Sequence, residues 1–194
     1  MDKLTRNYIF SLEKYSEIRP EFRRIVLGHK KNRQVSIGEH ATLYFEDSLT
    51  MQYQVQEMLR IEKIFDPDGI QEELDAYNPL IPDGSNWKAT FMIEYSDAEE
   101  RRHALTLLGG IENHVWVRIG SHEPVIAIAD EDIERSNYEK TSAVHFLRFE
   151  LSDQMIDALR LGANVAVGIS HKNYNYTVEK LDKKTVQSLV SDLF

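Results

Sequence analysis

The sequence predicts an α+β protein, in which an N-terminal helical layer with a small β-hairpin packs on a mainly antiparallel sheet. Residues 1–82 show helical periodicity interrupted by one pair of short strand patterns. Residues 83–194 contain a duplicated strand–helix–strand–strand unit, whose short strand connections favour antiparallel pairing. A chain of 194 residues can bury one stable core, so we treat residues 1–194 as a single domain with these two regions.

Three helices are predicted in the first region. The first is expected to begin at Pro20, because proline suits the first turn of a helix and apolar residues follow at helical spacing. Ser48 is expected to cap a long helix that runs to about Phe65. Residues 66–69, with the sequence DPDG, are a strong helix breaker, and a short helix is predicted over residues 70–77.

A β-hairpin is predicted between the first two helices, over residues 34–45. Val35 and Ile37 alternate with polar residues, Gly38 lies in the predicted turn, and residues 42–45 form the returning strand.

The duplicated unit begins with residues 91–97 in one copy and residues 147–153 in the other. Each segment is an alternating strand followed by a serine, Ser96 or Ser152, that is placed as a helix N-cap. A helix follows in both copies. The remaining strands are predicted at residues 115–119 and 125–129 in the first copy, and at residues 165–169 and 174–178 in the second.

A Ser-His pair, ending at His122 in one copy and His171 in the other, is predicted to form an equivalent turn in both. Two unrelated α/β segments can also share such a pattern. The repeated caps and turns favour duplication.

Composition and charge exclude several classes of protein. Hydrophobic residues make up 42% and charged residues 28%, which is typical neither of a disordered chain nor of a membrane-spanning one. The 23 basic and 32 acidic residues give a net charge of −9, which disfavours nucleic acid and anionic lipid as partners. The chain has no cysteine, which removes disulfides and thiolate chemistry. Residues 1–6 lack the apolar stretch of a secretory signal, so a cytoplasmic location is expected.

Four runs of the sequence together resemble a bacterial family of uncharacterised proteins, the domain of unknown function 3501. They are residues 45–50 (FEDSLT), 56–62 (QEMLRIE), 71–79 (QEELDAYNP) and 141–151 (TSAVHFLRFEL). The resemblance extends over nearly the whole chain. It supplies no catalytic residues. Genes of this family often neighbour those of rubrerythrin-like and iron–sulfur proteins, so the resemblance implies an accessory role in redox or peroxide metabolism, with a redox protein as partner.

One candidate site is a pair of carboxylates with a histidine. Glu62 lies near the middle of the apolar arc of the long helix, and Glu73 lies on the flank of the next apolar stripe. An antiparallel pair of helices would bring the two to similar height. Two buried carboxylates require a metal, a basic partner or a raised pKa. With His145 as a third ligand, the hypothesis is a divalent metal site for iron, manganese or zinc.

A structural interpretation of these residues stays open. Glu62 is close to a helix end and can turn its carboxylate to solvent or pair with an arginine. His145 lies on the mostly apolar face of its strand, where a histidine is usually hydrogen-bonded within the core.

A second candidate site is the basic stretch at residues 19–33. Its basic residues are Arg19, Arg23, Arg24, Lys30, Lys31 and Arg33, and Glu21 is its one acid. Arg23, Arg24, Lys30 and Lys31 are the candidate anion-binding residues. The alternatives are a solvated helix face, or a surface that meets an acidic surface of a second copy.

Known catalytic motifs are missing: the sequence has no glycine-rich phosphate loop and no nucleophile elbow. Whether the protein is an enzyme therefore stays open. The favoured hypothesis is a binding or accessory protein, expected to form a homo-oligomer. The alternatives are a metal-dependent protein or enzyme, and a phosphate or nucleic-acid binder that uses the basic stretch.

Overall fold

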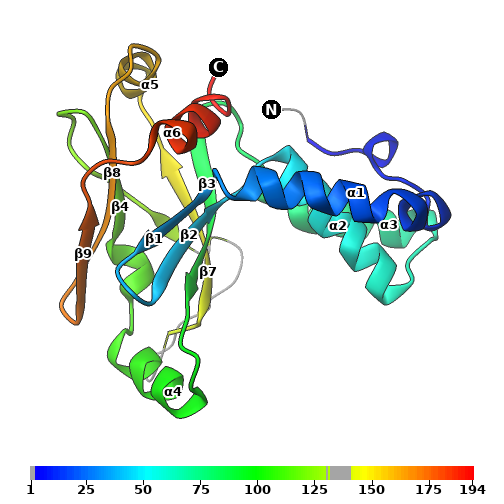
Figure 1. Ribbon diagram of the computed structural model, residues 1–194, viewed down its shortest axis with the longest axis horizontal. Helices are drawn as coiled ribbons and strands as arrows, with labels where there is room; N and C mark the ends of the chain where they lie inside the picture. The colour runs from blue at the N-terminus through cyan, green and yellow to red at the C-terminus, as the bar shows by residue number, and fades with distance from the viewer. Residues whose placement is uncertain (1–2, 130, 132–140) are drawn as a thin grey trace.

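The fold combines a β-sandwich with a helical arm that projects from its side (Figure 1). The structure is a computed structural model and describes residues 3–129, 131 and 141–194. In this part of the chain the strands form two antiparallel sheets. The predicted α+β class is therefore confirmed, and the strands are divided between two sheets, a point that the sequence left open.

The first sheet has the strand order β1-β2-β3-β7-β6. Its strands are β1 (Gln34–Ile37), β2 (Ala41–Phe45), β3 (Asn86–Ile93), β7 (Val144–Glu150) and β6 (Ile128–Ala129). The predicted hairpin is thus part of this sheet, because β2 pairs with β3, with Leu43 opposite Phe91. Alternation places Phe91 and His145 on the same inward face, as predicted for His145.

The second sheet has the strand order β5-β4-β8-β9. Its strands are β5 (Val125–Ile126), β4 (Val115–Ile119), β8 (Val165–His171) and β9 (Tyr174–Val178). The apolar faces of the two sheets share one core, which includes the fully buried Trp87 and Phe149 of the first sheet and Val117 and Val167 of the second.

Three helices lie at the ends of the sandwich: α4 (Ala98–Leu107) at one end, and α5 (Asp153–Arg160) and α6 (Lys183–Val190) at the other (Figure 1). A short 3-10 helix, η3 (Ile111–His114), leads from α4 into β4. The indole of Trp87 donates to the carbonyl of Leu189 at 2.9 Å, which ties α6 to the first sheet.

The arm consists of α1 (Leu12–Lys30), α2 (Ser48–Glu62) and α3 (Pro67–Tyr77), with two short 3-10 helices, η1 (Arg6–Tyr8) and η2 (Asn78–Leu80). The sequence predicted that these helices form a layer on a sheet, and this prediction is wrong. Their apolar residues face one another in a separate cluster of Leu4, Met51, Val55, Leu59, Leu74 and Ile81. The inner faces of the two sheets already cover each other, so the arm packs on itself.

Several helix boundaries differ from the prediction. Ser11 caps α1, and Pro20 lies inside this helix. Asp47 caps α2 in a capping box with Thr50, so the cap is one residue earlier than predicted. The predicted breaker at residues 66–69 instead starts α3, because Asp66 accepts a hydrogen bond from the helix N-terminus and proline suits the first position.

The predicted order of strand, helix, strand and strand is present twice, as β3-α4-β4-β5 and as β7-α5-β8-β9. Each of these two segments places its first strand in one sheet and its last two strands in the other. The prediction that the two Ser-His pairs form equivalent turns is wrong, since His122 follows a turn whereas His171 lies within β8. Residues 125–129 are divided between β5 and β6, which belong to different sheets.

One of the two predicted serine caps is wrong and the other is confirmed. Asp97, and not Ser96, caps α4, while Ser152 caps α5 as predicted.

No helix in the described ranges combines the length and the apolar character needed to span a bilayer.

Candidate functional site

A buried polar cluster lies where the arm joins the sandwich, and Arg33 is at its centre. Arg33 is 1% exposed. Its guanidinium donates to the carbonyls of Phe45 and Glu46, each at 3.0 Å, and to the carboxylate of Asp192. It also donates to the carbonyl of Ser188 at 3.0 Å. One side chain therefore connects the end of β2 with α6.

Asp47 extends this cluster into the arm. Its carboxylate caps α2 and lies 2.5 Å from Nε2 of His29 and 3.5 Å from Nε of Arg33. Burial alone would raise the pKa of Asp47, but the hydrogen bond to His29 and the Arg33 charge hold that pKa below its usual value. At Asp192 the effect of burial outweighs the Arg33 charge, and it raises the pKa of this carboxyl to about 6.

Glu46 is next to this cluster and is 5% exposed. One of its carboxylate oxygens accepts from Thr90 at 2.7 Å, and the other has no hydrogen-bond partner in the described part of the chain. With three carbonyls and two acids around one guanidinium, the cluster fastens the end of β2, the start of α2 and α6 together. The Arg33 guanidinium and the carboxylates of Asp47 and Asp192 are thus paired with one another inside the protein.

A second buried polar cluster lies in the sandwich around His145. The hydroxyl of Thr141 lies 3.0 Å from Glu112 and 2.8 Å from Nε2 of His145, which is also 3.1 Å from the carbonyl of Ser142. Glu112 and His145 are 3% and 0% exposed. His145 is thus held by several hydrogen bonds within the core.

His171 lies near this second cluster and is also buried. Its ring lies 5.4 Å from that of His114, in an edge-to-face arrangement. Burial, together with the nearby His114, lowers the pKa of His171, which favours the neutral ring.

The structure does not bring the predicted metal ligands together. Glu62 is exposed at the end of α2, and Glu73 is half-buried on α3. Burial raises the pKa of Glu73, and the nearby charge of Glu62 raises it further. His145 lies in the core of the sandwich, outside the arm. In the described ranges no group of three or more His, Asp or Glu side chains is arranged to hold a metal ion.

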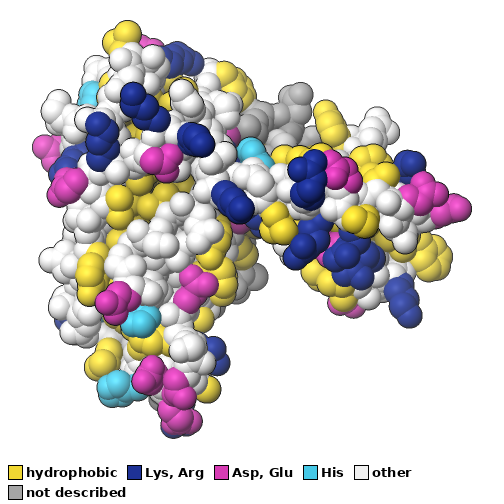
Figure 2. All heavy atoms as spheres, in the orientation of Figure 1, with side chains coloured by type: hydrophobic (Ala, Val, Ile, Leu, Met, Phe, Trp, Pro, Cys, Tyr) yellow, Lys and Arg dark blue, Asp and Glu magenta, His cyan; other side chains and the backbone are white. Residues whose placement is uncertain are grey.

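The basic stretch is divided by ion pairing. Arg19 pairs with Glu57 at 2.8 Å, Arg24 pairs with Glu21, and Arg33 is buried in the cluster described above. The other three cations, Arg23, Lys30 and Lys31, form no ion pair with any described residue. Figure 2 shows Lys and Arg side chains distributed over the arm among hydrophobic ones. Of the four predicted anion-binding residues, Arg24 is therefore paired with Glu21, and the other three have no acidic partner among the described residues.

Sequence reasoning missed the buried role of Arg33, because it counted this residue with its exposed neighbours. One signal was present: Arg33 lies two residues before Val35 on the alternating β1 pattern, so its inward face could have been expected.

Comparison with known proteins gives a family and a fold without an activity. No curated protein matches the chain. A crystal structure of a protein of unknown function from Burkholderia pseudomallei K96243 is similar, with 52% sequence identity, a TM-score of 0.95 and 100% of both chains covered. The family model described as "Protein of unknown function (DUF3501)" matches residues 3–193. The chain belongs to this DUF3501 family.

Proposed function

We propose that this protein is a binding or accessory protein that docks a redox protein through the exposed face of α1. The observation that carries the proposal is a cationic face with an apolar centre on a projecting helix. Arg23, Leu27 and Lys30 fall on one side of α1, at about 100° per residue, and Lys31 follows as its C-cap. Leu27 is 40% exposed, and the three cations around it pair with no acid in the described part of the chain.

The charge of the whole chain makes this face distinctive. Against a net charge of −9, three cations without an acidic partner among the described residues form a local surface of opposite sign. Such a surface attracts an acidic partner and orients it. The helix that carries it is held firmly, since Arg19 pairs with Glu57 and His29 pairs with Asp47.

A redox protein is proposed as the partner because of what the family resemblance implies. The complementary chemistry is an acidic surface with an apolar centre that accepts Leu27. A phosphate group or a nucleic acid is the alternative ligand for the same cations, and a second copy of this chain, as in the proposed homo-oligomer, is another.

Co-purification from native cells tests the proposal. The wild-type protein is compared with Arg23→Glu/Lys30→Glu/Lys31→Glu. The matched control is Arg101→Glu/Lys172→Glu/Lys184→Glu, which changes the net charge equally at three exposed positions of the sandwich. The recovered material is identified by mass spectrometry, iron content and visible absorption.

We expect the wild-type and control proteins to recover an iron-containing protein, and the arm variant to recover at least tenfold less. Failure to recover a redox protein with the wild-type chain contradicts the proposal, as does an equal loss in the control. Recovery of nuclease-sensitive material through the arm would favour the nucleic-acid alternative, and light scattering of the purified protein reports a homo-oligomer.

A metal-dependent protein stays the second hypothesis. The proximity of Glu62 and Glu73 favours it, and the exposure of Glu62 and the distant placement of His145 weaken it.

We also propose that the sandwich arose by duplication. The two units have the same element order, and their equivalent strands pair antiparallel, β3 with β7 and β4 with β8. Alignment of the two halves across many family sequences tests this origin.

A further inference from the structure

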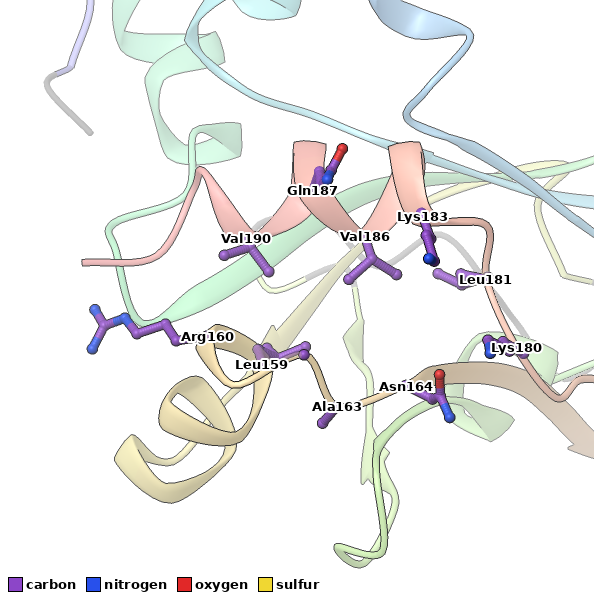
Figure 3. A pocket seen from close by; sticks show the side chains of 11 residues that line it. Leu159, Arg160, Ala163, Asn164, Lys180, Leu181, Lys183, Val186, Gln187 and Val190 are labelled. Atoms are coloured by element: carbon purple, nitrogen blue, oxygen red, sulfur yellow. The ribbon is translucent and has the colours of Figure 1, made fainter.

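A cavity of about 520 Å³ lies between α5 and α6, at the end of the sandwich opposite α4. This volume is within the range of small-molecule sites. Figure 3 shows Val186 and Val190 projecting from α6 towards Leu159 and Ala163 on the other side. Leu181 adds to the apolar wall.

The apolar walls leave space that neighbouring side chains do not fill. Protein interiors are normally close-packed, so facing aliphatic side chains with a gap between them lose contacts that a ligand can restore. Val186 and Val190 are only half-buried, although each points at another apolar side chain. A molecule with an aliphatic part would bury these surfaces.

One end of the cavity is cationic. Lys180, Lys183 and the amide of Asn164 line this end, on the side of the cavity away from Val190 and Arg160 in Figure 3. Neither lysine forms an ion pair with any residue that the structure describes. Arg160 lies at the other end, is paired with Asp157 at 3.2 Å and points away from the cavity in this view.

The charge of the lining is unusual for this chain. All residues that line the cavity belong to the described part of the chain, and none of them is acidic. In a protein with a net charge of −9, a cavity whose two lysines pair with no described acid, and whose lining holds no carboxylate, favours a negatively charged ligand. The apolar walls and the lysine end together favour a ligand with an aliphatic part and a negatively charged head group.

We propose that this cavity binds a small amphipathic anion, namely an aliphatic carboxylate. Its tail lies between the side chains of α6 and Leu159 and Ala163. Its head group accepts hydrogen bonds from Lys180, Lys183 and Asn164. This site is separate from the α1 face, so either proposal can fail without the other.

Titration with decanoate, below its micelle concentration, tests the site. Binding is measured by calorimetry and located by ¹H–¹⁵N spectra. We expect saturable binding with shifts confined to the amides around Leu159, Ala163, Val186 and Val190. Across hexanoate, octanoate and decanoate, affinity should rise about threefold to fourfold for each methylene that the cavity buries.

Two comparisons test the charge. Decanol and decylamine have the same tail with a neutral or a positive head, and both should bind at least tenfold more weakly than decanoate. Lys180→Ala/Lys183→Ala should also weaken decanoate binding about tenfold. Lys14→Ala/Lys172→Ala, which removes two exposed lysines elsewhere, should leave it unchanged.

Val186→Asp tests the tail site, because it adds a negative charge to a half-buried wall position, and it should abolish decanoate binding. Its fold is checked by its ¹H–¹⁵N spectrum, and Val186→Leu, which narrows the cavity, should favour the shorter carboxylates.

The absence of saturable decanoate binding overturns the proposal. Equal affinity for decanol, shifts outside the cavity, or unchanged affinity in the double lysine variant also overturn it. Binding of an acidic amphipathic peptide without binding of decanoate would assign the cavity to a protein partner instead.

Discussion

The arm and the sandwich are held together by different means. The sandwich has a continuous apolar core between two sheets, with large side chains such as Trp87 and Phe149 fully buried. The arm has a small apolar cluster and relies on polar side chains to position its segments. Gln56 pairs with both the N–H and the carbonyl of Phe10, at 3.0 and 3.1 Å, and Asn78 does the same for Leu4, at 2.7 and 2.9 Å.

This difference shows how a projecting element can be kept rigid without a large core. Hydrogen bonds to backbone groups are directional, so each amide fixes one position of the N-terminal segment. The arm is sensitive to the loss of these bonds, because a buried polar group that loses its partner keeps the cost of its desolvation, about 1–3 kcal/mol. Single substitutions of these polar side chains should therefore destabilise the arm and its base.

Arg33→Ala is expected to have the largest effect. It leaves the carboxylate of Asp192 buried without its cation, and removes the charge beside Asp47. Breaking a buried ion pair on one side costs about 3–5 kcal/mol. Chemical denaturation should show this loss in the free energy of unfolding. Arg24→Ala, which removes an exposed arginine from the middle of α1, should leave the free energy of unfolding nearly unchanged, because exposed ion pairs contribute little. Equal effects of the two would show that the cluster is not what joins arm and sandwich.

Leu74→Ala is expected to have the next largest effect, at about 3 kcal/mol, because Leu74 is fully buried in the arm cluster. Hydrogen exchange distinguishes the two regions. Loss of amide protection should be confined to α1, α2 and α3. Leu43→Ala, which removes an equally buried side chain from the sandwich, should lower protection across both sheets. Loss of protection throughout the chain in Leu74→Ala would mean that the arm and the sandwich unfold as one unit.

Local patterns predicted the strands better than the arrangement of layers. Residues 34–45 were assigned correctly as a hairpin, because alternation and a turn glycine are local signals. The placement of the helices was not, because an apolar stripe indicates that a helix packs but not against what. The predicted helix start at Pro20 is wrong for a similar reason. Proline suits the first turn of a helix, but here the cap at Ser11 and the length of α1 outweigh the one backbone hydrogen bond that Pro20 cannot donate.

The candidate sites were less predictable than the fold. The buried position of His145 followed from strand alternation, whereas the proposed burial of Glu62 depended on where a helix ends. α2 ends at Glu62, with Lys63 in the left-handed conformation, so this carboxylate reaches solvent. The cavity between α5 and α6 is formed by segments that come together only in the folded chain, and no spacing in the sequence indicates it.

Acid should weaken the arm through Glu57. Hydrogen bonds from Arg19, and then from Arg60 and Tyr15, lower the pKa of Glu57 to about 2. Because the folded pKa is below the unfolded one, this stabilisation is complete above about pH 4.5 and is lost as the pH falls towards 2. Asp192 has the opposite dependence, since its raised pKa of about 6 makes stability fall as the pH rises towards that value.

Glu57→Gln should lower the free energy of unfolding by about 1–3 kcal/mol at pH 7, with little effect at pH 2. Denaturation of both proteins between pH 2 and 7 measures the difference. Glu13→Gln, at an exposed position of α1, serves as the control. A difference that does not depend on pH would rule out the ionised carboxylate as the source.

Glu62→Gln should have the smallest effect. Its carboxylate is exposed, so neutralising it removes only a weak repulsion from Glu73 and should change the free energy of unfolding by less than about 0.5 kcal/mol. A metal bound by both carboxylates would reverse this expectation, because loss of a ligand would destabilise the metal-loaded protein. Elemental analysis of protein made in medium rich in iron, manganese and zinc should find less than one metal per chain, and the same amount in Glu62→Gln. A stoichiometric metal that Glu62→Gln releases would instead make the arm a metal site, and would mean that a bound ion adds to the hydrogen bonds that stabilise it.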